Sequence, residues 1–231
     1  MVTKIANNLE KVKKNIDDIL KKNGRSAKDI ALICVSKFQD KDKILEAYET
    51  SHRDFGENRV QEFLEKQSFL PKDIRWHFIG TLQKNKVRKV IGKCFLIHSV
   101  DSFELAEKIS NVSLEVKLKT QILIQVNTSS ESSKNGLSRT CWEKHWEKLL
   151  DLKGVEIQGL MTIASNTADQ KIVKENFKAL KEFLKELNLK YYRENPMKQL
   201  SMGMSGDYEQ AIEEGASYIR VGSNIFGLRC S

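Results

Sequence analysis

The feature that most constrains the fold of this chain is a repeated order of elements, in which a short apolar run is followed by a polar turn and a helical pattern. The run at residues 30–36 is almost wholly apolar, as expected of a parallel strand buried on both faces. Strands that alternate with helices form parallel sheets, and eight such units predict a closed (β/α)8 TIM barrel. The predicted strands are residues 30–36, 54–56, 75–79, 95–99, 121–126, 156–163, 199–202 and 218–221.

Helices are predicted between the strands and also before the first of them. Ile5, Leu9 and Val12 follow a helical spacing in an extra N-terminal helix at residues 3–23, which Gly24 ends. The chain contains no Pro-, Gly- or Ser-rich linker, so we expect one domain over residues 1–231. The other helices are predicted at residues 41–50, 59–67, 138–150, 168–187 and 207–214, from Lys84 and from Ser102, with a last turn at 224–228.

Composition and residue spacing exclude several classes of protein. No apolar run reaches the ~18 residues of a membrane span, and the first residues lack the apolar core of a signal peptide, so no membrane association is expected. Four widely spaced cysteines favour a reducing, cytoplasmic setting. The four histidines lack metal-binding spacing, so no metal site is expected. The net charge of +8 comes from lysines dispersed among acidic residues, which predicts no nucleic-acid partner.

Lys37 is the first candidate functional residue. The active site of a (β/α)8 barrel lies at the carboxyl ends of the strands, and Lys37 directly follows the apolar run 31–35. Burial disfavours the charged form of an amine, lowers its pKa and makes it nucleophilic toward an aldehyde. The alternative is a lysine at a strand end whose ammonium group reaches solvent.

The segments after the last two predicted strands have the composition of a phosphate site. Gly203, Gly206 and Gly222 allow close approach of a ligand to the backbone, and Ser205 and Ser223 offer hydroxyl donors. Barrels of this type often bind phosphate at this place, although tight turns capped by serine would have the same composition. A lysine and a phosphate site that face one cavity suggest a phosphorylated carbonyl compound, either pyridoxal 5′-phosphate (PLP) or a sugar-phosphate aldehyde.

Seven segments, in order along the chain, carry a family resemblance. They are residues 31–37 (ALICVSK), 55–62 (FGENRVQE), 76–86 (WHFIGTLQKNK), 132–136 (SSKNG), 159–163 (GLMTI), 200–205 (LSMGMS) and 220–227 (RVGSNIFG). In these segments the chain resembles the pyridoxal phosphate homeostasis protein family, from about residue 31 to residue 229. The resemblance implies a barrel similar to the N-terminal domain of bacterial alanine racemase, with PLP bound as a Schiff base on Lys37.

The same resemblance implies roles for six other residues. Ser205, Gly222 and Ser223 would hold the phosphate group, and Arg220 would lie beside the pyridine nitrogen. The remaining two are Asn58, near the cofactor, and Met161, along its ring.

The implied place of Arg220 has a chemical consequence. An arginine stays protonated, so it would keep the ring nitrogen unprotonated and weaken the ring as an electron sink. The alternative is an arginine that ends its strand in a salt bridge. Two departures from the family pattern occur in loops: Phe38 and Gln39 stand where the family often has Thr and Pro, and Thr81 stands where His is frequent. We expect them to alter loop shape and partner contacts more than cofactor binding.

Three functions follow from a reactive lysine in such a barrel. The leading hypothesis is a PLP-binding protein that carries or buffers the cofactor in the cell, with little or no catalysis, and supplies apo PLP-dependent enzymes. An amino-acid racemase is the alternative. It needs a second acid–base group, which a C-terminal domain provides in racemases of this fold, and we expect that domain and its dimer surface to be absent because the sequence ends at Ser231. We therefore expect a monomer. A class I-type aldolase would need a carboxylate close to Lys37, which residues 30–36 do not offer.

Overall fold

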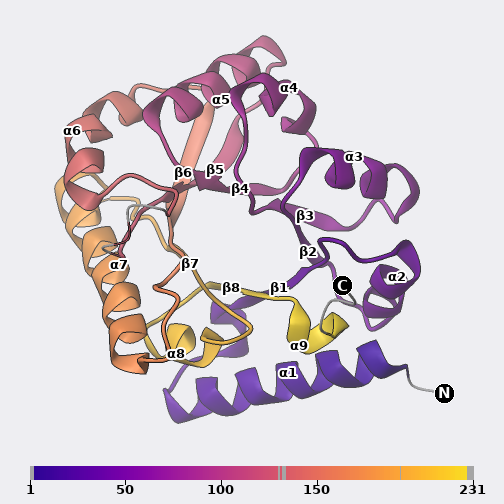
Figure 1. Cartoon of the computed structure of the whole chain (residues 1–231). Coiled ribbons are helices and arrows are strands. Elements are labelled where there is room, and N and C mark those ends of the chain that lie inside the picture. The colour runs from indigo at the N-terminus through magenta and orange to yellow at the C-terminus, as the bar shows by residue number, and fades with distance from the viewer. Residues whose placement is uncertain (1–2, 130, 132–133, 193, 228–231) are drawn as a thin grey trace.

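The eight strands of the computed structural model, which describes residues 3–129, 131, 134–192 and 194–227, form one closed parallel barrel. Each strand pairs with the next along the chain, and the last pairs with the first (Figure 1). The predicted (β/α)8 architecture is confirmed. The strands are β1 (Ala31–Val35), β2 (Asp54–Glu57), β3 (Arg75–Phe78), β4 (Leu96–Val100), β5 (Thr120–Gln125), β6 (Val155–Met161), β7 (Gln199–Met204) and β8 (Tyr218–Val221).

Helices surround the barrel as an outer ring, and the predicted extra N-terminal helix runs along α8 and α9 (Figure 1). The α-helices are α1 (Lys4–Lys22), α2 (Lys41–Glu49), α3 (Val60–Phe69), α4 (Val87–Val90), α5 (Phe103–Glu115), α6 (Arg139–Leu150), α7 (Gln170–Tyr191), α8 (Tyr208–Glu213) and α9 (Ser223–Phe226). Two short 3-10 helices complete the set, η1 (Ala27–Asp29) and η2 (Lys84–Lys86).

One apolar face holds α1 against the rest of the molecule. Thr3 caps the helix, because its Oγ1 accepts the backbone N–H of Ala6 at 3.2 Å. Leu9 is fully buried on the face that packs against α2, α8 and α9. Asn8 Nδ2 donates to the carbonyl oxygen of Ile225 in α9 at 3.0 Å. The N-terminal helix therefore supports the short helix that follows the last strand.

The structure differs from the sequence prediction between β3 and β4. The sequence predicts one helix from Lys84, whereas the chain forms η2 and then the short helix α4. Val87 and Val90 are both buried, and the helix ends two residues before Gly92, which has a φ of +75°. A left-handed conformation does not continue a right-handed helix, so the glycine turns the chain toward β4.

The barrel interior contains a small apolar cluster that is separate from the main core. Leu96, Leu123 and Met161 form this cluster, while their neighbours Ile97 and Ile122 belong to the main core between strands and helices. Alternate residues of a strand point to opposite faces, so the cluster members point inward. Much of the remaining interior is polar, and this polar part adjoins the candidate site.

Replacing Leu9 by alanine should lower the free energy of unfolding by roughly 2–5 kcal/mol, because the change leaves a cavity in a fully buried position. Chemical denaturation measures this loss. Lys11→Ala, an exposed change on the same helix, should stay within roughly 0.5 kcal/mol of the wild type. A Leu9→Ala protein as stable as the wild type would contradict the packing of α1 described here.

Candidate functional site

A cavity of about 720 Å³ opens at the carboxyl ends of the strands, where the fold predicts a site. It brings together six of the seven residues that the sequence singles out: Lys37, Asn58, Ser205, Arg220, Gly222 and Ser223. The rest of its wall consists of Val35, Gln39, Ile79, Ile163, Met204, Gly206 and Gly227.

Met161 lies deeper in the barrel than this cavity. It is almost fully buried in the interior cluster with Leu96 and Leu123, and Ile163 packs against that cluster. Alternate residues of a strand share a face, so Met161 and Ile163 both point inward, and Ile163 is the one that lines the cavity. The resemblance places Met161 along the ring of the cofactor, whereas in the structure it lies one layer below the cavity and does not line it.

The residues on both sides of Lys37 are held by hydrogen bonds to acidic side chains. Lys37 follows β1 directly, is half-buried and lines the cavity. Ser36 donates its hydroxyl to Glu57 Oε1 at 2.6 Å, and the N–H of Phe38 donates to Glu62 Oε2 at 2.9 Å. Phe38 has a φ of +61°, which is uncommon for a residue other than glycine. These contacts fix the loop that carries the lysine.

Lys66, which lies in α3, binds both of these acidic side chains. Its Nζ donates to Glu57 Oε1 at 2.8 Å, to the carbonyl oxygen of Ser36 at 2.8 Å and to Glu62 Oε2 at 3.3 Å. Lys66 is 6% exposed and Glu57 is fully buried. Burial raises the pKa of Glu57, against the charge and hydrogen bond of Lys66, which lower it. Both members of this buried ion pair bind Ser36, so the pair helps to hold the loop that carries Lys37.

Replacing Lys66 by methionine should lower the free energy of unfolding by roughly 3–5 kcal/mol at neutral pH, because it leaves the buried carboxylate of Glu57 without its cation. Removing the cation raises the folded-state pKa of Glu57 further above its unfolded value. A group with a raised folded pKa contributes stability at low pH that is lost as the pH rises. The deficit of the variant should therefore be smaller in acid than at neutral pH.

Denaturant unfolding of both proteins at several pH values measures this difference. Glu65→Gln, an exposed change one position before Lys66, serves as the control and should follow the wild type at every pH. A deficit for Lys66→Met that is the same at all pH values would contradict an ionised, unpaired Glu57.

Arg220 reaches the cavity from β8 through a buried polar environment. The residue is 3% exposed, and its two Nη atoms donate to Ser201 Oγ at 2.7 Å and to the carbonyl oxygen of Thr162 at 2.9 Å. Burial lowers its pKa to about 10, so the side chain remains a cation at neutral pH. Arg220 forms no salt bridge with any of the described residues, and the nearby charge of Asp207 favours its protonated form. The partners of Arg220 are therefore neutral oxygens.

The loops after β7 and β8 are joined at Ser205. Its Oγ accepts the N–H of Gly222 at 3.1 Å, and its carbonyl oxygen accepts from Asn224 Nδ2 at 3.1 Å. A Cβ on Gly222 would lie 3.3 Å from the Cβ and carbonyl oxygen of Val35, so a residue without a side chain fits this approach of β8 to β1. Because Ser205 Oγ accepts from Gly222, its own hydrogen is available to donate into the cavity.

Asn58 provides a polar atom that the protein itself does not satisfy. The residue follows β2 and lines the cavity, and its Oδ1 is buried without a hydrogen-bond partner among the described residues. Buried side-chain oxygens are almost always hydrogen-bonded. An unpartnered amide oxygen in a cavity wall therefore indicates a place for a polar group of a ligand.

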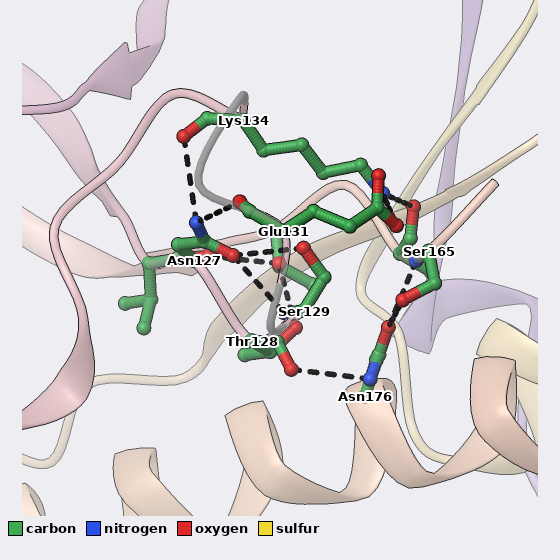
Figure 2. Close-up of polar contacts among 10 residues, drawn as sticks. Asn127, Thr128, Ser129, Glu131, Lys134, Ser165 and Asn176 are labelled. Carbon is green, nitrogen blue, oxygen red and sulfur yellow. Dashed lines mark hydrogen bonds and ion pairs between the residues drawn. The ribbon is translucent and has the colours of Figure 1, made fainter.

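A network of hydrogen bonds ties the loop after β5 to the loop after β6, which contributes Ile163 to the cavity wall (Figure 2). Lys134 Nζ donates to the carbonyl oxygen of Ala164 at 2.6 Å, and Asn127 Nδ2 donates to that of Glu131 at 3.0 Å. Asn176 of α7 joins the two loops by further bonds, accepting from Ser165 N and Oγ and donating to the carbonyl oxygen of Thr128. We call the two joined loops the rim; Lys134 and Asn135 of the motif at 132–136 lie in it, and residues 132 and 133 lie outside the described residues.

The two departures from the family pattern lie in the loops that follow β1 and β3. Thr81 Oγ1 accepts from Asn135 Nδ2 at 2.8 Å, which links the loop after β3 to the rim. Phe38 is 47% exposed, and the guanidinium carbon of Arg59 lies 4.6 Å from its ring centroid. Thr81 is therefore bonded to the rim, and Phe38 forms part of the outer surface beside the lysine loop.

Neither a metal-binding cluster nor a membrane-spanning helix is present in the described part of the chain. It contains no group of three or more His, Cys, Asp or Glu residues arranged to hold a metal ion. None of its helices is both long enough and apolar enough to cross a membrane.

Fold and site together define an alanine racemase-type barrel. The family model described as "Alanine racemase, N-terminal domain" matches residues 7–230. Alanine racemase of Clostridium difficile 630 has the same fold, with a TM-score of 0.75 at 14% identity, over 98% of this chain and 57% of that one.

Relatives with higher sequence identity carry the name pyridoxal phosphate homeostasis protein. The pyridoxal phosphate homeostasis protein of Aquifex aeolicus is 39% identical over 222 residues, which cover 96% of both chains. That of Homo sapiens is 39% identical over 86% of this chain and 76% of its own length. The solved structure of PipY from Synechococcus elongatus PCC7942 with PLP bound is 36% identical, with a TM-score of 0.81, and covers 92% of this chain and all of PipY. The chain belongs to the pyridoxal phosphate homeostasis protein family.

Sequence reasoning missed part of this site. Ile79 and Ile163 could have been found, because alternate residues at the carboxyl ends of strands point into the barrel. Glu57 and Lys66 gave no signal, since they are nine residues apart and come from a strand and a helix. The spacing of the histidines predicts no metal site and gives no sign that His77 is fully buried in the barrel interior, where it contacts Asp54.

Proposed function

We propose that this protein binds PLP in the cavity and serves in cellular PLP homeostasis by carrying or buffering the cofactor, with little or no catalysis. The observation that carries the proposal is that Lys37, Arg220 and the Ser205–Gly222 contact all border one cavity. The names of its relatives and the PLP bound in PipY point the same way. PLP supplies an aldehyde that condenses with a primary amine and a ring that can accept electrons.

Lys37 is the amine in this proposal. Its half-buried side chain follows a strand and faces the cavity, and the bonded residues on both sides restrict its backbone. A lysine held in this way loses less conformational entropy when it binds than a lysine on a mobile loop. We therefore assign Lys37 as the covalent attachment point.

Ser205, Gly222 and Ser223 are the proposed phosphate ligands. The hydroxyl groups of Ser205 and Ser223 border the cavity, and Gly222 precedes the helical turn of α9, whose first N–H groups lack helical acceptors. Anions bind well to such N–H groups when hydroxyl donors lie beside them.

Arg220 and Asn58 are the proposed partners of the ring. Arg220 is cationic, buried and held by two oxygens, so a ring nitrogen beside it would stay unprotonated. An unprotonated ring accepts electrons poorly, which supports a carrier over a racemase. The unpartnered Oδ1 of Asn58 would meet a polar substituent of the ring.

Transfer of PLP to apo PLP-dependent enzymes, a cytoplasmic location and a monomeric state remain predictions. Phe38, which directly follows the proposed attachment point, offers an exposed apolar side chain for such a partner contact.

Replacing Lys37 by alanine should abolish the covalent adduct and its visible absorption band while leaving weaker, noncovalent PLP binding. The test incubates each protein with PLP, records the visible spectrum before and after borohydride, and maps the modified peptide. Lys41→Ala, which removes an exposed lysine from the start of α2, is the control and should keep the adduct. A wild type without a reducible adduct at Lys37 would refute the assignment, and racemisation assays on several amino acids test the rival activity.

Replacing Ser205 by alanine should weaken PLP binding by roughly tenfold or more, because a hydrogen bond to a charged group is lost. The same variant should bind pyridoxal, which lacks the phosphate, about as well as the wild type does. Equilibrium titrations with both ligands measure the difference. Equal losses for PLP and pyridoxal would mean that Ser205 does not contact the phosphate.

A further inference from the structure

A continuous chain of hydrogen bonds crosses the interior of the barrel and ends at Arg220. His77 of β3 contacts Asp54 of β2 through Nε2 at 3.1 Å and His98 of β4 through Nδ1 at 2.9 Å. His98 Nδ1 then contacts Ser201 Oγ of β7 at 2.8 Å, and that oxygen accepts from Arg220 of β8 at 2.7 Å. We call Asp54, His77, His98, Ser201 and Arg220 the core hydrogen-bond chain.

The members of the core hydrogen-bond chain are removed from water. His77, His98 and Ser201 are fully buried, and the other two members are less than one-tenth exposed. The ring of Tyr218 packs against both histidines, with centroid distances of 5.6 and 5.3 Å. The strands involved lie on different sides of the barrel (Figure 1), so the chain links one side of the barrel to the other through its interior.

The two ends of this chain determine the direction of every bond in it. An ionised carboxylate can only accept, so His77 carries its hydrogen on Nε2 and donates to Asp54. The Nδ1 of a neutral His77 is then an acceptor, so His98 carries its hydrogen on Nε2 and donates to it. The Nδ1 of His98 in turn accepts the hydroxyl hydrogen of Ser201, whose oxygen accepts from the guanidinium group of Arg220, a group that can only donate.

The charge states of the members agree with this direction. Burial lowers the pKa of His77 and of His98, so both rings are neutral and each can donate one bond and accept one. Burial works against the charged form of Asp54, but hydrogen bonds from Arg75 and His77 outweigh it and hold the pKa of that carboxyl below its usual range. Arg75 Nε and Nη2 bind both carboxylate oxygens, at 2.8 and 2.5 Å.

We propose that the core hydrogen-bond chain is a positioning device for Arg220, in which Ser201 and His98 hold its guanidinium group in one orientation toward the ligand cavity. One Nη of Arg220 is committed to Ser201 and the other to the carbonyl oxygen of Thr162, while the residue lines the cavity. Because the hydrogen of Ser201 is committed to His98, the oxygen of Ser201 faces Arg220 only as an acceptor. The histidines therefore help to determine the orientation in which the guanidinium group of Arg220 faces the cavity.

The tautomers of His77 and His98 test this direction in the ligand-free protein. Long-range ¹⁵N–¹H spectra of the histidine side chains should show both rings neutral, each with its hydrogen on Nε2. A wild-type His98 that is protonated, or that carries its hydrogen on Nδ1, would overturn the proposal. His52 accompanies the measurement as an internal reference, because its Nε2 contacts the carbonyl oxygen of Asp54 outside the chain of bonds.

Ser201→Ala tests the link to Arg220. It removes the donor to His98 Nδ1, so the Nδ1 signal of His98 should shift, and the orientation of Arg220 should loosen. The claim about the ligand rests on the proposed function. In the PLP-loaded protein the visible band should move and the affinity for PLP should fall roughly tenfold, as expected when an acceptor of a charged group is lost. Ser201→Thr keeps the hydroxyl and should restore both signals.

Ser113→Ala is the matched control, since Ser113 is also fully buried and bonded, to the carbonyl oxygen of Ile109 and to Thr120 Oγ1, but lies outside the barrel interior on α5. It should change stability without moving the His98 signal or the visible band. An unchanged band in Ser201→Ala, or an equal change in Ser113→Ala, would overturn the positioning role. A wild type that binds no PLP would refute the proposed function and the ligand part of this inference, while the tautomers would still decide the direction of the chain.

Discussion

The pairing of β8 with β1 joins the last strand of the chain to the first, and the candidate site depends on it. In this register Ile33 lies opposite Arg220 and Cys34 opposite Val221, so Gly222 reaches Val35 just before Lys37. A parallel barrel brings the carboxyl ends of all its strands to one end, which is why residues almost two hundred positions apart can share a cavity. The helix α1 supports this closure from outside, because it packs against α9, the turn that follows β8.

Most polar groups buried near the pairing of β8 with β1 are bonded to another polar group. Lys66 neutralises Glu57 beneath the Lys37 loop, and the core hydrogen-bond chain connects Arg220 to Asp54. Each charge would be costly to bury alone, and each is accompanied by hydrogen bonds that offset this cost. The exceptions are Glu57 Oε2 and the Oδ1 of Asn58, which are buried without partners in the described residues. Of these two residues, only Asn58 lines the cavity, which suits an atom reserved for a ligand.

Much of the fold and of the candidate site could be predicted from the sequence, because these features depend on local residue patterns. Apolar runs and helical spacing predicted the eight strands and the extra helix at the N-terminus, and strand ends predicted that Lys37 and the serine–glycine segments after the last two strands would face one cavity. The division of the helical segment after β3 into η2 and α4 was not predicted, and Gly92 ends that segment two residues after Val90. Nor was the depth of Met161, which depends on the layer that each inward residue occupies in the closed barrel.

The sequence by itself determined the class of fold, the candidate lysine, the serine and glycine residues of the loops after the last two strands, and the family to which the chain is similar. These depend on residue types in order along the chain, and order is what a sequence records. The tertiary structure decided which polar side chains are buried together and in which direction their hydrogen bonds run. Lys37 illustrates both parts: its position after an apolar strand marked it in the sequence, whereas the side chains of Glu57, Glu62 and Lys66 that hold its loop come together only when β2 and α3 pack beside β1. Distance along the chain carries no information about such contacts, because closing the barrel is what makes them neighbours.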